Sequence, residues 1–111
     1  MAEKKTFVTL EQLKEIDKTY HTPYHLYDEK GIRENAKKLK EAFSWNKGYR
    51  EYFAIKATPN PYILKILKDY GCGVDCASMT ELMMAYALDY KPEEIMFSSN
   101  DTPAEEYEYA A

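Results

Sequence analysis

The stretch Tyr52–Pro61, YFAIKATPNP, decides the fold because it joins a short apolar run to two prolines. The run Phe53–Ile55 is apolar, and the prolines beyond it interrupt regular structure, so the pattern predicts a buried strand that stops in a turn. Lys56 closes this expected strand. Because side chains alternate along a strand, Lys56 is predicted to share a face with the small residue Ala54.

A lysine at the end of a buried strand has two interpretations. In a parallel sheet covered by helices, an ammonium group must be paired, stripped of its proton or placed at the end of the strand, where active sites gather. Lysine amines that are partly removed from water attack aldehydes and form Schiff bases. The alternative is a lysine that only reaches solvent from the strand end. The residues around Lys56 leave both interpretations open.

From residue 52 onward, short apolar runs alternate with helical patterns. Strands are expected at 52–56, 73–77 and 95–99, and each is followed by an amphipathic pattern with its own start signal. This alternation predicts an α/β fold of parallel βα units joined by right-handed crossovers. It does not separate a closed barrel from an open, doubly wound sheet.

The part of the chain before the βα units predicts two helices and one strand. A leading helix is expected over 10–20, a strand over Tyr24–Tyr27 and a second helix over 29–43, capped by Asp28. The expected organisation is a single domain over 1–111, in which 1–28 form the leading helix and strand and 29–111 form the βα units.

Asp75 is the second candidate residue. It alternates with Val74 and Cys76 along the expected strand 73–77, so it faces away from the helices on which they pack. That face is where Lys56 of the neighbouring strand is expected. A carboxylate near an amine holds it charged or orients it. A structural ion pair or a hydrogen bond to the next turn is the alternative interpretation.

The composition excludes several classes of function. Fifteen basic and nineteen acidic residues give a net charge of −4, and no basic cluster is interleaved with aromatics, so no nucleic-acid partner is expected. No apolar run is long enough for a membrane span, and a cytoplasmic protein is the expectation. Cys72 and Cys76 are expected to be reduced apolar fillers. His21 and His25 are separated by a proline, which argues against a helix and a metal site.

Two motifs in combination resemble those of the pyridoxal-phosphate amino-acid decarboxylases of the alanine-racemase-like fold, and within them the diaminopimelate decarboxylases. They are YFAIKATPNP and Gly71–Ser78, GCGVDCAS, followed by Glu81–Leu82. The resemblance runs from about Thr22 to the last residue. It implies that the βα units are the N-terminal part of a pyridoxal-phosphate-binding (β/α)₈ barrel of the TIM type.

The resemblance also implies the chemistry. Lys56 would be the catalytic residue that carries pyridoxal 5'-phosphate as a Schiff base, and Asp75 would lie in the cofactor pocket. The implied reaction is decarboxylation of an amino acid, with meso-diaminopimelate converted to lysine, by a homodimer in the full-length family. An ornithine or arginine decarboxylase or a racemase is the alternative within the fold, although Thr58–Pro61 lacks the Tyr-Gly-His-Gly run of the racemases.

Length and two departures from the family pattern qualify this expectation. A (β/α)₈ barrel takes roughly 250 residues, so the 111 residues are expected to be an N-terminal portion that is inactive alone and prone to self-association. Thr58 stands where the family usually has Asn, and Ser98–Asp101 stands where it usually has Asn-Lys. A non-catalytic α/β domain that binds partners through free strand edges is the alternative from another class.

Overall fold

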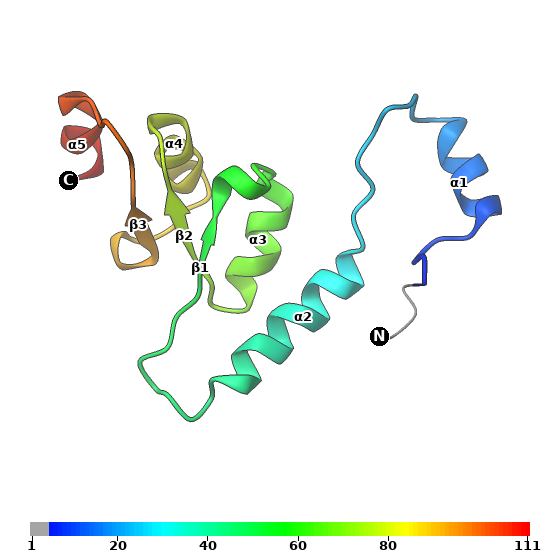
Figure 1. Ribbon diagram of the computed structural model, residues 1–111, viewed down its shortest axis with the longest axis horizontal. Coiled ribbons are helices and arrows are strands. Elements are labelled where there is room, and N and C mark those ends of the chain that lie inside the picture. Colours follow the sequence, from blue (N-terminus) through cyan, green and yellow to red (C-terminus); the bar gives the residue numbers. More distant parts are fainter. Residues whose placement is uncertain (1–4) are drawn as a thin grey trace.

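The computed structural model describes residues 5–111 and contains one parallel sheet of three strands in the order β1-β2-β3. The strands are β1 Tyr52–Ala54, β2 Gly73–Cys76 and β3 Ile95–Phe97. A helix connects each strand to the next (Figure 1). The prediction of parallel βα units is confirmed.

Five α-helices and two short 3₁₀ turns complete the described chain. The helices are α1 Leu10–Asp17, α2 Glu29–Ala42, α3 Pro61–Asp69, α4 Met79–Ala87 and α5 Ala104–Ala110, and the 3₁₀ turns are η1 Ile55–Ala57 and η2 Pro92–Glu94. Among residues 5–111 we find no helix with both the length and the apolar character that crossing a membrane requires.

Side-chain caps mark the start of four helices, including α1, which Thr9 caps. The side-chain oxygens of Asp28, Asn60 and Ser78 accept hydrogen bonds from backbone N–H groups in the first turns of α2, α3 and α4, as the sequence predicts. Gly71 follows α3 with φ +85°, a conformation that favours glycine, and so ends the helix before β2. Asn60 and Gly71 thus mark the two ends of the helix that connects β1 to β2.

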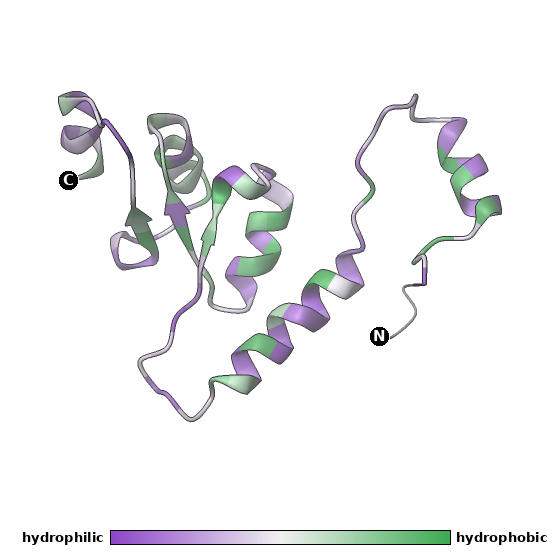
Figure 2. Cartoon of the chain, viewed as in Figure 1, coloured by the Kyte–Doolittle hydropathy of each residue, from purple (hydrophilic) through white to green (hydrophobic). Residues whose placement is uncertain are grey.

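The hydrophobic core lies on one face of the sheet. Ile55, Leu64, Val74 and Cys76 have no exposed surface, and Leu82 and Ala85 of α4 join them. Figure 2 shows apolar residues concentrated in α3, α4 and the strands, whereas α2 is largely hydrophilic. Cys72 and Cys76 are both buried, as expected of apolar fillers. Burial raises the pKa of the Cys76 thiol to about 12.

The opposite face of the sheet, called the open face below, carries Tyr52, Ala54, Gly73, Asp75 and Met96. These residues share a face because strand register places Tyr52 beside Gly73, and Ala54 and Met96 on either side of Asp75. Met96 is 48% exposed, whereas Ile95 and Phe97 on either side of it are partly buried against the core. The open face is therefore accessible in the middle of the sheet.

At the amino end of the open face, the Tyr52 ring lies against Gly73. A Cβ atom on Gly73 would lie 2.8 Å from a ring carbon of Tyr52 and 2.5 Å from the carbonyl oxygen of Glu94. The Tyr52 hydroxyl donates a hydrogen bond to the Glu93 carbonyl oxygen at 3.0 Å. Tyr52 thus crosses from β1 over β2 to the turn before β3, and only a glycine fits beneath it.

The leading part of the chain differs from the prediction. The strand expected at Tyr24–Tyr27 is wrong, because these residues form neither helix nor strand and the three strands of the sheet pair only with one another. A strand requires a hydrogen-bonded neighbour, and the segment runs beside α3 instead of along a sheet edge (Figure 1). α1 ends at Asp17, shorter than expected, and buries no residue. The division of the domain at residue 28 stays a prediction.

Candidate functional site

Lys56 lies in a 3₁₀ turn, so the strand predicted to end at Lys56 is wrong at that end. β1 stops at Ala54, and the Thr58 N–H closes the turn η1 by donating to the Ile55 carbonyl oxygen at 3.0 Å. The turn buries the Ile55 side chain completely while Lys56 is exposed. Strand alternation from Ala54 therefore cannot assign the direction of the Lys56 side chain.

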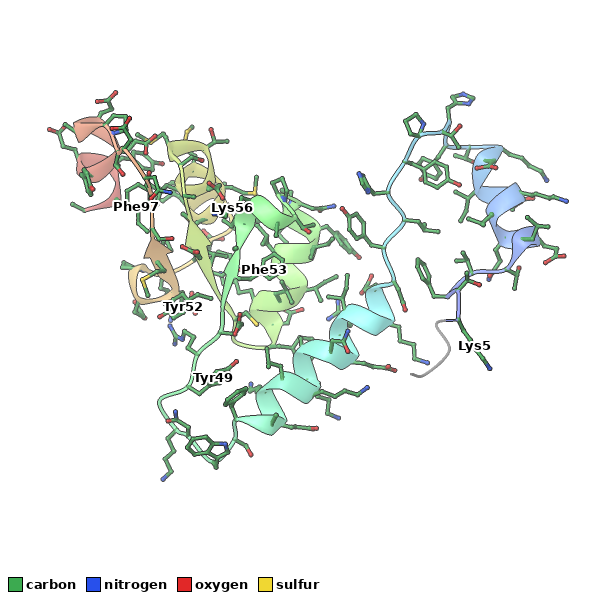
Figure 3. The ribbon with its side chains drawn as sticks, viewed as in Figure 1. Lys5, Tyr49, Tyr52, Phe53, Lys56 and Phe97 are labelled. Carbon is green, nitrogen blue, oxygen red and sulfur yellow. The ribbon has the colours of Figure 1, made fainter. Side chains whose placement is uncertain are left out.

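The position of Lys56 is nevertheless that of a functional residue in a parallel sheet. It follows the carboxyl end of β1, at the opposite end of the strand from Tyr52 (Figure 3). Ligands of parallel α/β sheets bind outside this end of the strands. Within residues 5–111 the Lys56 amine takes part in no ion pair and no hydrogen bond. It is available to a ligand.

Asp75 occupies the open face of β2, as the alternation predicts. Its neighbours Val74 and Cys76 are completely buried on the core face, while Asp75 is half-buried. Its carboxylate oxygen Oδ1 accepts a hydrogen bond from the Ser98 hydroxyl. Asp75 thus faces away from the helices and is held from the β3 side.

Lys56 and Asp75 come to the same edge of the sheet from adjacent strands. Asp75 is level with Ala54, two residues before Lys56. In the described part of the chain, no hydrogen bond or ion pair joins the two side chains directly. Their joint role in a cofactor pocket therefore stays a prediction.

Glu81 does more than cap α4. Its Oε2 accepts hydrogen bonds from the Ala77 N–H at 3.0 Å and from the Ser78 hydroxyl at 2.8 Å, and the residue is only 8% exposed. Its other oxygen, Oε1, is buried and has no partner among the described residues. Because an unsatisfied buried oxygen costs free energy, capping of α4 does not account for Glu81 completely.

Ser98 is a neighbour of the candidate site that the sequence does not single out. It belongs to the segment that departs from the family pattern, and its hydroxyl contacts Asp75. The available signal was alternation, since Ser98 lies two residues beyond Met96, the neighbour of Asp75 in β3. Placing β3 beside β2 in register would have put both residues on the open face.

A hollow of about 730 Å³ opens beside the turn that contains Lys56. Ala57–Pro61 line one side of it, and His25 and Tyr27 of the leading segment line the other. Ala57, which lines this hollow, directly follows Lys56 in the sequence. Across residues 5–111, no group of three or more His, Cys, Asp and Glu side chains is placed to hold a metal ion.

Comparison with known proteins identifies the family. Residues 29–111 match the family model of the pyridoxal-dependent decarboxylases, pyridoxal binding domain. Protein TabA of Pseudomonas amygdali pv. tabaci is 43% identical over 98 residues, which are 88% of this chain and 23% of TabA. Diaminopimelate decarboxylase of Helicobacter pylori is 40% identical over 96 residues, 86% of this chain and 24% of the enzyme. The chain belongs to the pyridoxal-dependent decarboxylase family.

Solved structures agree with this assignment. Diaminopimelate decarboxylase from Helicobacter pylori, complexed with L-lysine, superposes with a TM-score of 0.78 at 37% identity, over 88% of this chain and 25% of that one. Ornithine decarboxylase from Entamoeba histolytica gives a TM-score of 0.76 at 27% identity, over 90% and 32%. The prediction of the N-terminal part of a pyridoxal-phosphate-binding (β/α)₈ barrel is confirmed. The chain spans about a quarter of the length of the curated relatives it matches.

The cofactor of the family is pyridoxal 5'-phosphate, and the residues present fit its reactive end. An aldehyde requires an amine that is accessible and not committed to another group, and Lys56 is exposed and free of ion pairs among the described residues. The half-buried carboxylate of Asp75 lies on the adjacent strand. The sheet edge thus offers both a nucleophile and a group that can orient it.

Proposed function

We propose that the protein to which these residues belong is an amino-acid decarboxylase in which Lys56 holds pyridoxal phosphate and Asp75 belongs to the cofactor pocket. The observation that supports the proposal most strongly is the position of Lys56. It is an exposed amine in the first turn after β1, beside a strand that carries an acidic residue on its open face.

The residues have distinct parts in the proposed chemistry. Bound pyridoxal phosphate supplies an aldehyde for amines and a ring that accepts the electron pair left when carbon dioxide departs. Lys56 anchors the cofactor through its amine. Asp75 would orient the amine, because a carboxylate on the adjacent strand can accept a hydrogen bond from it. The small side chain of Ala54, level with Asp75 on β1, leaves space on the open face.

The proposed substrate is meso-diaminopimelate, which would be converted to lysine. Relatives named diaminopimelate decarboxylase, at 32 to 40% identity, support this choice. The likeness to ornithine decarboxylase from Entamoeba histolytica supports an alternative diamino-acid substrate such as ornithine. A homodimer is the proposed assembly of the whole protein. The proposed compartment is the cytoplasm, where buried thiols such as Cys72 and Cys76 stay reduced.

Covalent mapping tests the role of Lys56. Reduction of the cofactor-loaded protein with borohydride, followed by peptide mass mapping, is expected to place the cofactor mass on the peptide that contains Lys56. Lys56→Ala should abolish the label. Lys65→Ala is the matched control, because Lys65 is an exposed lysine on α3, and it should leave the label unchanged. A cofactor mass found on another lysine would contradict the assignment.

A substrate panel tests the reaction. Carbon dioxide release is measured with meso-diaminopimelate, ornithine, lysine and arginine, and loss of optical activity is measured for a racemase. Release from meso-diaminopimelate alone is the expected result. Preference for another amino acid would change the proposed substrate but would leave the proposed class, an amino-acid decarboxylase, unchanged. Cofactor binding with no turnover of any amino acid would favour the non-catalytic α/β domain.

A further inference from the structure

Ser98 reaches the candidate site from the third strand. It directly follows β3, and its backbone N–H continues the strand pairing by donating to the Cys76 carbonyl oxygen at 2.9 Å. Its side chain alternates with Phe97, which packs against the core, so Ser98 lies on the open face with Met96. The hydroxyl donates to Oδ1 of Asp75.

The strand register shows toward which end of the sheet the Ser98–Asp75 hydrogen bond points. Asp75 is level with Ala54 in β1 and with Met96 in β3. Lys56 and Ser98 each lie two residues farther along their strands, toward the carboxyl edge of the sheet. The hydrogen bond from Ser98 therefore draws the Asp75 carboxylate toward the edge at which Lys56 lies, and it does not hold the carboxylate level with its own strand neighbours.

The contact with Ser98 also leaves the Asp75 carboxylate able to accept further hydrogen bonds. A carboxylate has two oxygens and accepts several hydrogen bonds, and Ser98 uses one position on Oδ1. Among the described residues, no other side chain or backbone group donates to the Asp75 carboxylate. Without Ser98, a half-buried carboxylate on an accessible face would have nothing to select one side-chain rotamer over another.

We propose that Ser98 is a positioning residue for the lysine site: it holds the Asp75 carboxylate toward the carboxyl edge of the sheet, the edge at which Lys56 lies. This inference rests on the proposed roles of Lys56 and Asp75. If Ser98 has this role, β3 contributes to the site. The contributing residue then lies in the segment 98–101, at which the chain departs from the family pattern.

The test uses the longest natural polypeptide that contains these residues, after its pyridoxal phosphate has been removed. Pyridoxal phosphate is added back, and its attachment to Lys56 is followed by absorbance and by borohydride trapping. Ser98→Ala is expected to slow attachment roughly three- to tenfold, the range for the net loss of one ordinary hydrogen bond. Ser98→Thr keeps the hydroxyl and should restore the rate. Ser99→Ala is the neighbouring control and should leave it unchanged.

A double-mutant cycle separates positioning from a general structural effect. If Ser98 acts through Asp75, then Ser98→Ala should change the rate by less than about twofold when Asp75→Ala is already present. Equal slowing by Ser98→Ala and Ser98→Thr, or the same loss in the Asp75→Ala background, would overturn the proposal.

The controls also separate failure of this inference from failure of the proposed function. Attachment that survives Lys56→Ala would remove the proposed role of Lys56 itself. Attachment that is abolished by Lys56→Ala but unaffected by Ser98→Ala would overturn only the role of Ser98.

Discussion

The Lys68 ammonium group on α3 donates hydrogen bonds to the carbonyl oxygens of Leu88 and Asp89, at 2.9 and 2.7 Å. These carbonyls follow the last turn of α4 and have no helical partner, so a lysine from one βα unit caps the helix of the next. The same ammonium lies 4.8 Å from the centre of the Tyr90 ring. One side chain thus ties together α3, α4 and the turn before β3.

Replacing Lys68 should loosen the end of α4. Lys68→Met keeps the aliphatic stem but removes the donors and the charge, and we expect it to lower the free energy of unfolding by about 1 to 2 kcal/mol. Denaturant unfolding measures the loss, and hydrogen exchange should locate it in the last turn of α4. Lys65→Met, on the exposed side of the same helix, should be nearly neutral. Equal effects of the two variants would contradict the capping role.

Gly73 is predicted to tolerate no side chain. The Cβ of Gly73→Ala would lie 2.5 Å from the Glu94 carbonyl oxygen, which belongs to the backbone and cannot move aside cheaply. We expect destabilisation of about 1 to 3 kcal/mol, as for other overpacked positions. Gly48→Ala is the control, because its Cβ would meet only the Asn46 side chain, at 3.6 Å. Denaturant unfolding that ranks Gly48→Ala as the worse variant would refute the clash.

Stability is predicted to fall in alkaline solution. Burial raises the pKa of the Cys76 thiol from 9.0 to about 12, so above pH 9.0 the unfolded chain releases a proton that the folded chain keeps. The contribution is complete below pH 9.0 and is lost as the pH rises toward 12. Burial also raises the pKa values of Cys72 and Tyr90, and these shifts act with the same sign.

Cys76→Ala isolates the thiol. The variant should be less stable near neutral pH, because it leaves a small cavity, yet it should lose less free energy of unfolding between neutral and alkaline pH than the parent. Unfolding free energies of both proteins across this range provide the measurement. Parallel pH profiles would show that Cys76 is not a source of the alkaline sensitivity.

The 111 residues, expressed alone, should associate and should not release carbon dioxide. Among residues 5–111, β1 and β3 each pair with one strand, so each leaves an edge of backbone donors and acceptors open to other chains. Sedimentation over a range of concentrations should show self-association. Catalytic carbon dioxide release that Lys56→Ala abolishes would contradict the expectation of inactivity.

Local signals made much of this fold predictable, and long-range contacts explain the misses. The caps at Asp28, Asn60 and Ser78 depend on neighbours within four residues, and the alternation of Val74, Asp75 and Cys76 is a property of one strand. These features could be predicted from the sequence alone. The strand expected at Tyr24–Tyr27 has the composition of a strand, but pairing depends on a partner that composition does not specify.

The sequence names Lys56 and Asp75 as candidate site residues, but it does not predict the local geometry around them. The position of Lys56 after an apolar run identified it as a candidate, but the burial of Ile55 bends the chain into a turn that strand alternation cannot anticipate. The hydrogen bond between Ser98 and Asp75 joins residues 23 apart in the sequence. Only the register of β2 with β3 brings them together, so this contact required the structure.

The Tyr52 ring over Gly73 closes the amino end of the open face. The ring, anchored to the Glu93 carbonyl oxygen, covers the start of β2, where even a methyl group would collide. Tyr52 is therefore a fixed stop for any molecule that lies along this face. It sets how far such a molecule can extend from the carboxyl end of the strands, where Lys56 lies, toward the amino end.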